Sequence, residues 1–343
     1  MGKQSIIFCI DGRVDLLTKV IAQYEDMCAN LGIERGVDLL IGDADVVKFS
    51  DKESNAALLS SVRGKRVYLL STPNTADKIM QLNFAIDSAK RAGAKEIIPI
   101  VPYFPYSRSD KKDQPRGPIA AKVIAEMLEN RGATDLITFD LHADQIQGFF
   151  NIPVIHMEGQ YTFDKYIKDV CNQEGDVILC SPDAGAAKRV KSYRDRMRNY
   201  DLDLRMVMID KTRKEANIVD TMVLIGDVTG ENVIIIDDMT DTGGTLCKAA
   251  EYLMEEGAKS VRAIATHGVL SGPAFERIAN SKLHNFVCSD TLPIPKTVEI
   301  DRDGGRMLVN TEEIVYVISC DRQIAKAILA INSNRSINEL KKG

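Results

Sequence analysis

Residues 233–246, VIIIDDMTDTGGTL, place three carboxylates and two adjacent glycines directly after a run of β-branched residues. Glycines let backbone amides point inward, and a helix that begins here adds partial positive charge, so the loop can bind a phosphate. The carboxylates would repel a bare phosphate but suit the hydroxyls of a ribose or a Mg²⁺ ion. An acidic turn with a Thr or Asp N-cap is the alternative interpretation. The pattern favours a ribose-phosphate site formed by Asp237, Asp238, Asp241, Thr242, Gly243, Gly244 and Thr245.

Residues 102–118, PYFPYSRSDKKDQPRGP, gather aromatic rings, cations and four prolines into one loop. Rings interleaved with cations such as Arg108 and Lys111 are suited to stacking a purine and binding a polyphosphate. A solvated charged surface is the alternative interpretation.

Two further loops offer ligands for a metal ion. ITFDLHADQ places Asp140 and His142 two residues apart at the end of a strand, so both side chains lie on one face. CSPDAGAAKRV adds Asp183 at another strand end. Together these groups could hold one Mg²⁺, with a neutral imidazole as the unusual member. A histidine alone is more often a packed or hydrogen-bonded residue.

The segment MIDKTRKEANIVD begins as a strand and then exposes Lys211, Arg213 and Lys214. Cations on a mobile flap could neutralise the charge that develops on a transferred phosphate. Without other support, a solvated basic loop explains the same residues.

Alternating strands and helices must position these loops. AGAKEIIPIV, RGATDLITFD and EGAKSVRAIA each pass from a glycine that ends a helix to a buried strand. Such alternation implies parallel sheets covered on both faces, with ligands bound at the carboxyl ends of the strands. The two halves share this pattern, which suggests a duplicated architecture with a boundary around residues 152–160.

Two helices are predicted with their apolar faces. One spans residues 118–132, with Pro118 near its start and Gly132 near its end, and its apolar face comprises Ile119, Val123, Ile124, Met127 and Leu128. The other follows the glycine loop, and its apolar face comprises Leu246, Ala250, Leu253 and Met254.

The composition bounds the class of protein. With 343 residues, 45% hydrophobic and 27% charged, the chain suits a soluble protein of about two domains. The net charge of −5 argues against nucleic acid as a partner, and no stretch is apolar enough to span a membrane. Seven scattered cysteines without C-x-x-C spacing fit reduced thiols in the cytoplasm.

These motifs together resemble the ribose-phosphate pyrophosphokinases, or PRPP synthetases, from about KFSDKE at residue 48 to THGVLSGPAFERI at residue 266. The likeness is strongest in YSRSDKKD, DLHADQIQGFF, SPDAGAAKR, DKTRKEAN and IDDMTDTGGT. It implies two phosphoribosyltransferase-like (Rossmann-like) α/β domains, each a mainly parallel sheet flanked by helices, over residues 1–157 and 158–343. It also implies an enzyme that uses Mg²⁺ to transfer the β,γ-diphosphate of ATP to the 1-hydroxyl of ribose 5-phosphate, and that forms homo-oligomers from dimer to hexamer.

The resemblance assigns roles to individual residues. Lys211 and Arg213 match the catalytic flap, and the loop from Asp237 to Thr245 matches the ribose 5-phosphate site. His142 and Asp183 match metal ligands, with Asp140 beside them. The expected ATP contacts, some supplied by a neighbouring subunit, are Phe49, Asp51, Glu53, Arg108, Ser109 and Asp113.

The sequence departs from the family pattern at three of these places. Ser109 replaces a glutamine that touches ATP, and Asn151 and Ile155 replace two acids after QIQGFF. The region 290–303 is also remodelled. These departures bear on regulation and on the identity of the acceptor rather than on the transfer chemistry.

The departures leave three other functions open. The acceptor could be a larger ribose-phosphate such as ADP-ribose, as in NAD metabolism, which predicts a wider cleft beyond the DTGGT loop. A catalytically inactive PRPP-synthetase-associated subunit is a different class, opposed by the retained flap and loop motifs. An ordinary phosphoribosyltransferase would not need the DLHADQIQGFF and SRSDKKD motifs. The sequence does not give the oligomer size or the regulators.

Overall fold

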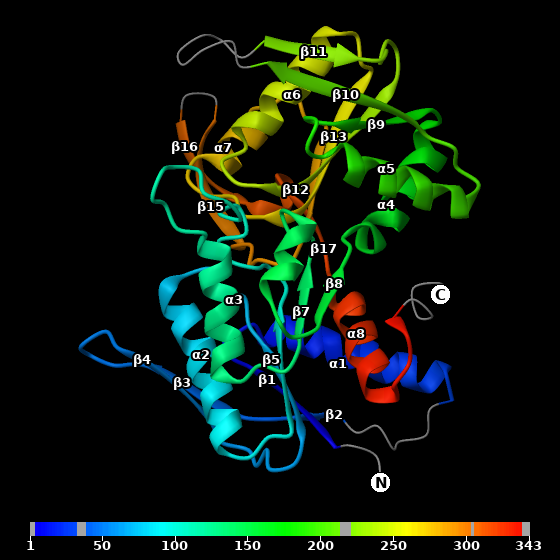
Figure 1. The fold of residues 1–343 in the computed structure, drawn as a ribbon. Coiled ribbons are helices and arrows are strands. Elements are labelled where there is room, and N and C mark those ends of the chain that lie inside the picture. Colours follow the sequence, from blue (N-terminus) through cyan, green and yellow to red (C-terminus); the bar gives the residue numbers. More distant parts are fainter. Residues whose placement is uncertain (1–3, 33–38, 213–220, 303–304, 338–343) are drawn as a thin grey trace. The chain divides into compact units, whose positions relative to one another are not determined.

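The computed structural model describes residues 4–32, 39–212, 221–302 and 305–337, and only the backbone of Lys211, Thr212, Thr221 and Arg302. The chain divides into two compact units, coloured by sequence in Figure 1. Unit 1 comprises Met1–Glu158 together with Ser319–Gly343, and unit 2 comprises Gly159–Ile318.

Unit 1 is built on a sheet of six parallel strands in the order β2-β1-β5-β6-β7-β8. Its strands are β1 (Ser5–Cys9), β2 (Leu39–Ile41), β5 (Arg66–Leu70), β6 (Glu96–Val101), β7 (Leu136–Phe139) and β8 (Val154–Met157). An antiparallel hairpin, β3 (Ala44–Lys48) and β4 (Ser54–Leu58), packs through β4 on α2 (Ala76–Arg91). Figure 1 shows its tip projecting away from α2.

Helices cover both faces of this sheet. Ile6 and Phe8 of β1 pack in one core with α2 and α3 (Ala120–Arg131). Ile7, between them in the sequence, packs in the opposite core with α1 (Val14–Asn30) and α8 (Asp321–Ser333). Successive strand residues point to opposite faces, so a strand buried on both sides reads as a continuous apolar run.

Unit 2 is built on a sheet of seven strands in the order β11-β10-β9-β12-β13-β14-β17, in which only β11 is antiparallel to its neighbour. Its strands are β9 (Val177–Ser181), β10 (Arg205–Thr212), β11 (Thr221–Ile225), β12 (Asn232–Thr240), β13 (Ser260–Gly268), β14 (Asn285–Ser289) and β17 (Tyr316–Ile318). A hairpin of β15 (Thr297–Arg302) and β16 (Gly305–Asn310) packs against α7 (Ala274–Ala279).

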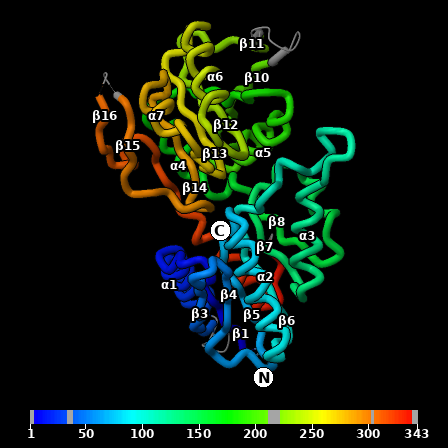
Figure 2. The backbone as a smooth tube through the Cα atoms, turned by 90° about the vertical axis from the view of Figure 1, so that its left-hand side faces the viewer, coloured from blue at the N-terminus to red at the C-terminus, as the bar shows by residue number. Residues whose placement is uncertain are grey.

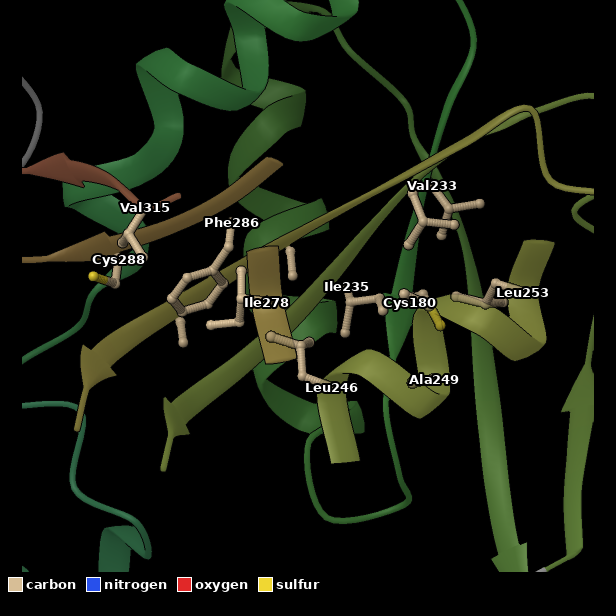
Figure 3. Close-up of a cluster of buried hydrophobic side chains, with 14 of the residues drawn as sticks. Cys180, Val233, Ile235, Leu246, Ala249, Leu253, Ile278, Phe286, Cys288 and Val315 are labelled. Carbon is tan, nitrogen blue, oxygen red and sulfur yellow. The ribbon is translucent and has the colours of Figure 1, made fainter. Parts of the chain in front are cut away.

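The helices of unit 2 also lie on both faces of the sheet. α6 (Gly244–Glu255) and α7 share one core, whereas α4 (Gln160–Glu174) and α5 (Ala187–Met197) share the other. Figure 3 shows α6 packed on β9 and β12 through Leu246, Ala249 and Leu253 on the helix and Cys180, Val233 and Ile235 on the strands. Three 3-10 turns complete the elements of the described chain: η1 (Asp144–Phe149), η2 (Arg198–Tyr200) and η3 (Thr311–Glu313).

The predicted α/β fold of two mainly parallel sheets flanked by helices is confirmed. The two predicted helices are present as α3 and α6, and α3 ends before Gly132, whose φ is 125°. One residue of the predicted α3 face is wrong, since Val123 is 48% exposed whereas Ile124 and Leu128 are buried. No helix in the described parts of the chain is long and apolar enough to cross a membrane.

The C-terminal helix corrects the predicted extent of the second domain. Residues 319–343 were expected to belong with residues 158–318, but α8 packs against α1 and the sheet of unit 1. Asn332, at its end, accepts hydrogen bonds from Ser5 Oγ (2.8 Å) and Tyr68 Oη (2.9 Å). An apolar helix can pack on any matching apolar face, and its place in the sequence does not say which sheet it covers.

Candidate active site

The strand order of unit 2 reverses between β9 and β12, and the candidate site residues lie there. From β9 the chain continues through α5 to β10 on one side, and from β12 through α6 to β13 on the other. Right-handed crossovers then place α5 and α6 on opposite faces, which leaves the carboxyl ends of β9 and β12 uncovered between them. Asp183 follows β9, and the glycine loop follows β12.

The glycine loop opens directly into α6. Its N-cap is Gly243, with φ 72°, and within the described residues no side chain caps the first turn. This geometry does not fit the alternative of a Thr or Asp N-cap. The first N–H groups of a helix have no partner within the helix, and together with the helix dipole they bind anions.

Hydrogen bonds from Ser271 and Arg277 hold this loop in place. Ser271 donates a hydrogen bond to the carboxylate of Asp241, and its own amide donates to the Asp241 carbonyl at 3.0 Å. Arg277 Nη1 donates to the carbonyl of Thr242 at 3.1 Å. Asp241 therefore anchors the loop, whereas the sequence had suggested only a ligand-facing role.

Asp237 and Asp238 lie inside β12, which extends beyond the predicted end at Ile236 because it pairs with β13 as far as Thr240. Arg189 of α5 lies opposite both, with Nη1 at 3.8 Å from Asp237 Oδ1 and 3.6 Å from Asp238 Oδ1. Burial and the neighbouring Asp238 raise the pKa of Asp237 to about 8. The pair is thus short of positive charge and suits a cation or hydroxyl donors.

Arg189 was not among the predicted site residues, although the motif SPDAGAAKR ends on it. It lies in the run AKRVKSYRDRM, whose other cations read as an ordinary solvated helix face. Its place in that motif, six residues after Asp183 on the same βα connection, is the signal that could have marked it.

A cavity of about 860 Å³ adjoins the loop. Asp183, Thr242, Gly244 and Thr245, all predicted site residues, line it. Asp183 Oδ1 also accepts the amide of Ala186 at 3.0 Å, which fixes the turn after β9. The structure thus brings Asp183 and the glycine loop to one cavity.

In unit 1, Asp140 and His142 follow β7. Asp140 is buried with φ 25°, unusual for a residue with a side chain, and its amide donates to the Met157 carbonyl at 3.0 Å. His142 is exposed. The turn is held by His156 of β8, a residue that the sequence reading missed: its Nε2 accepts the amide of Leu141 at 3.0 Å.

The predicted ATP loop lies between β6 and α3, and Figure 2 shows it reaching beyond the start of α3. Arg108 and Asp113 are exposed on it. Ser109 has a structural role, because its Oγ accepts the amide of Ala120 at 3.4 Å and its carbonyl accepts that of Ala121 at 3.2 Å. A serine at this position therefore holds the start of α3.

The tip of the β3–β4 hairpin carries three other predicted ATP contacts. Phe49 is 51% exposed, and Asp51 and Glu53 are exposed beside it. The turn is well formed, with the amide of Phe49 donating to the Glu53 carbonyl at 2.8 Å. The hairpin presents these side chains to solvent in the single chain.

The two other departures from the family pattern also have local structural roles. Asn151 donates from its amide and from Nδ2 to the carboxylate of Glu129, at 3.0 and 2.9 Å. These hydrogen bonds lower the pKa of Glu129, and an acid at residue 151 would repel it instead. Ile155 packs into the core shared with α1 and α8.

The predicted catalytic pair lies at the edge of the described chain. The backbone of Lys211 belongs to β10 and pairs with Met222 of β11, but its side chain and all of Arg213 lie outside the described residues. Their roles remain predictions.

The expected metal ligands fall in different units, with Asp140 and His142 in unit 1 and Asp183 in unit 2. Within either unit, the described residues form no cluster of three or more His, Cys, Asp or Glu side chains suited to a metal ion. The partly buried Asp237 and the buried Asp238 nevertheless fit a divalent cation, since one Arg189 faces two carboxylates.

Fold and site define an α/β protein of two similar units, one of which has a glycine loop suited to an anion at its switch point. Sequence comparison is more specific. The profile of the N-terminal domain of ribose phosphate pyrophosphokinase matches residues 7–132, and that of the phosphoribosyl synthetase-associated domain matches residues 207–340.

Individual relatives agree with these profiles. Ribose-phosphate pyrophosphokinase 2 of Saccharomyces cerevisiae is 40% identical over 312 residues, 90% of this chain and 92% of the yeast protein. The enzyme of Caldanaerobacter subterraneus is 39% identical over 310 residues, 90% of this chain and 92% of its own. The crystal structure of phosphoribosylpyrophosphate synthetase from Mycobacterium smegmatis superposes with a TM-score of 0.80 at 32% identity, covering 97% of this chain and 100% of that one.

The chain therefore belongs to the ribose-phosphate pyrophosphokinase family, as the motifs suggested, and it is an enzyme of that class. These relatives carry the name of the enzyme, which favours neither the inactive-subunit interpretation nor the larger acceptor.

Proposed function

We propose that the protein transfers the β,γ-diphosphate of ATP to the 1-hydroxyl of ribose 5-phosphate, giving PRPP and AMP for nucleotide biosynthesis. The observation that carries this proposal is the start of α6. A glycine N-cap in the left-handed conformation, with no side-chain cap among the described residues, lies at the switch point of unit 2, beside the carboxylates of the partly buried Asp237 and the buried Asp238. Amides for a phosphate and carboxylates for hydroxyls are the two requirements of a ribose phosphate.

In this mechanism, the amides at the start of α6 bind the 5-phosphate and Asp237 and Asp238 accept hydrogen bonds from the ribose hydroxyls. This fixes the 1-hydroxyl as the nucleophile, and positioning carries much of the rate in phosphoryl transfer. Mg²⁺, when bound by the carboxylates and the phosphates, would neutralise charge on the transferred group. Lys211 and Arg213 would stabilise the developing charge from the flap.

We assign ATP to the exposed residues of unit 1, namely Arg108 and Asp113 of the loop before α3. Phe49, Asp51 and Glu53 would complete the adenine site of a neighbouring subunit in a homo-oligomer. The support is their exposure on a hairpin with a rigid turn, since a solvent-facing phenylalanine beside two acids suits a partner's nucleotide. The seven cysteines are all free thiols, which fits the reducing cytoplasm.

The test is product analysis by mass spectrometry after mixing purified protein, ATP, Mg²⁺ and ribose 5-phosphate. The proposal expects AMP and a diphosphorylated ribose 5-phosphate in equal amounts, and neither product without Mg²⁺. AMP formed without the diphosphorylated sugar, or no AMP at all, would contradict it.

A further inference from the structure

The cavity beside the glycine loop extends well beyond the residues assigned to the acceptor phosphate. Its volume of about 860 Å³ is that of a pocket for a whole small molecule, and one phosphoryl group at a helix N-terminus needs far less. Past the loop, three cations line it: Lys248 of α6, Arg277 of α7, and Lys282 in the turn that follows α7.

Two of these cations, Lys248 and Arg277, lie at the first turns of α6. Lys248 lies one turn after Gly244 on α6, so it continues the face on which the phosphate loop opens. A Cβ atom at Gly244 would lie 3.2 Å from Arg277 Nη1, so the guanidinium packs against the first turn. Arg277 uses one of its five donors for the Thr242 carbonyl and is held at the border between loop and cavity.

The remaining lining indicates which anion would fit. Glu251 and Asp183 add two carboxylates, and Asn280 and Ser281 add an amide and a hydroxyl. Three cations against two carboxylates favour an anion, but one that also presents hydroxyl groups to accepting oxygens. A phosphate ester of a sugar combines both features.

We propose that this part of the cavity is a second phosphoryl subsite, adjacent to the acceptor-phosphate loop and formed by Lys248, Arg277 and Lys282. This inference rests on the proposed function, because it takes the loop as the site of the first phosphate. The second phosphoryl group could belong to an acceptor whose 5-phosphate is itself esterified, or to a separate phosphate ion.

The experiment uses the Lys248→Gln/Lys282→Gln double variant, with Arg277 left in place because it supports the loop. Lys259→Gln, an exposed lysine beyond the end of α6, is the matched control. AMP release from ATP and ribose 5-phosphate is measured at increasing concentrations of ADP-ribose, which carries an esterified 5-phosphate. It is measured separately at increasing concentrations of inorganic phosphate. Direct binding of ADP-ribose is measured by calorimetry.

If the subsite takes an extended acceptor, ADP-ribose competes with ribose 5-phosphate. In the double variant, the ratio of its inhibition constant to the KM for ribose 5-phosphate then rises at least about tenfold. If it takes a separate ion, phosphate alters the rate without competing, and the double variant loses that effect. Lys259→Gln should match the wild type in both arms.

Unchanged responses to both ligands in the double variant would overturn the inference and leave the proposed function standing. If ribose 5-phosphate is not turned over at all, the proposed function fails by itself. Calorimetry with ADP-ribose then still decides the subsite, because a tenfold weaker affinity in the double variant does not depend on turnover.

Discussion

In unit 1 the switch point between β1 and β5 is bridged by a carboxylate of the chain itself, whereas in unit 2 the switch point between β9 and β12 presents carboxylates beside an open loop. Asp11 Oδ2 accepts the amide of Thr72 at 2.6 Å, and Arg13 Nη1 lies 3.5 Å from Thr72 Oγ1. In unit 2, Asp237 and Asp238 face Arg189, and the loop beyond them borders a cavity.

The six parallel strands follow the same order in both units, with β11 added at the edge of unit 2. The same strand order therefore carries chemically different loops at the carboxyl ends of the strands in the two units. In unit 1 a carboxylate accepts a backbone amide across the switch point, and in unit 2 two adjacent carboxylates face one arginine. We therefore expect a carboxylate at the switch point to stabilise the fold in unit 1 and to serve binding at the expense of stability in unit 2.

The largest effect is expected from Asp237→Asn. Losing an acceptor for the ribose hydroxyls and half of the carboxylate pair should lower kcat/KM for ribose 5-phosphate by about 100-fold or more. The same change should raise the free energy of unfolding of the ligand-free protein at pH 8 by several kcal/mol, because each pKa unit by which the folded carboxyl exceeds the unfolded one costs the ionised state about 1.4 kcal/mol. Steady-state kinetics and chemical denaturation measure the two effects.

The pH dependence of that stability difference has a definite sign. The folded-state pKa of Asp237, about 8, exceeds the value of about 4 for an unfolded Asp, so the proton binds the folded state more tightly. Wild-type stability should nearly equal that of Asp237→Asn at pH 4, fall progressively behind it between pH 4 and 8, and stay behind by a constant amount above pH 8. A difference that shrinks with rising pH would contradict this.

The next effect concerns Gly243. An alanine at φ 72° lowers the free energy of unfolding by about 1–2 kcal/mol. It would also shift the amides at the start of α6, so the KM for ribose 5-phosphate should rise about tenfold. Gly257→Ala is the matched control, because it has φ 90° in the same unit but lies after α6. It should lose similar stability with an unchanged KM. Equal KM effects in both variants would mean that strain, and not the loop, is being measured.

A smaller effect is expected at the turn after β7. His156→Ala removes the acceptor of the Leu141 amide, which is worth about 1 kcal/mol, and should weaken kcat/KM for ATP by roughly three- to tenfold. His156→Gln can place an oxygen near the Nε2 position and should restore part of the loss. If His156→Gln restores no activity, or if His156→Ala changes only the free energy of unfolding, His156 does not position this turn for activity.

Asp11→Asn should have the smallest effect on function. It weakens a charge-assisted hydrogen bond to the Thr72 amide and should lower the free energy of unfolding by roughly 1 kcal/mol. The KM for ribose 5-phosphate should not change. An altered KM would show that the carboxyl end of β1 also takes part in binding the acceptor.

The part of the site in unit 2 that lies within one short segment was predictable from the sequence. Strand, acidic exit, glycine turn and helix follow one another within residues 233–246, so their types and spacing define the loop. Arg189 and His156 were not predicted as site residues, because each acts on a residue from another element and the motif SPDAGAAKR does not show what its Arg189 faces. The strand β12 was read too short because pairing with β13, and not the residue types alone, carries it through Asp237 and Asp238.

The same distinction between local patterns and tertiary packing applies to the fold. Periodicity predicted the helices and the two-faced sheets, but could not assign α8 to the sheet of unit 1, which depends on tertiary packing and on hydrogen bonds to Asn332. Exposure of Val123 shows the same limit at one residue. An apolar side chain at a helical period is not buried if no neighbour covers it.

The most direct test is the affinity of ribose 5-phosphate for the wild type, Asp237→Asn and Asp11→Asn, measured by calorimetry with Mg²⁺ present. The two variants make the same chemical change at the switch points of the two units. We expect Asp237→Asn to weaken binding by about 100-fold or more, and Asp11→Asn to leave it unchanged. Equal affinities in the two variants would contradict the placement of the acceptor at the switch point of unit 2.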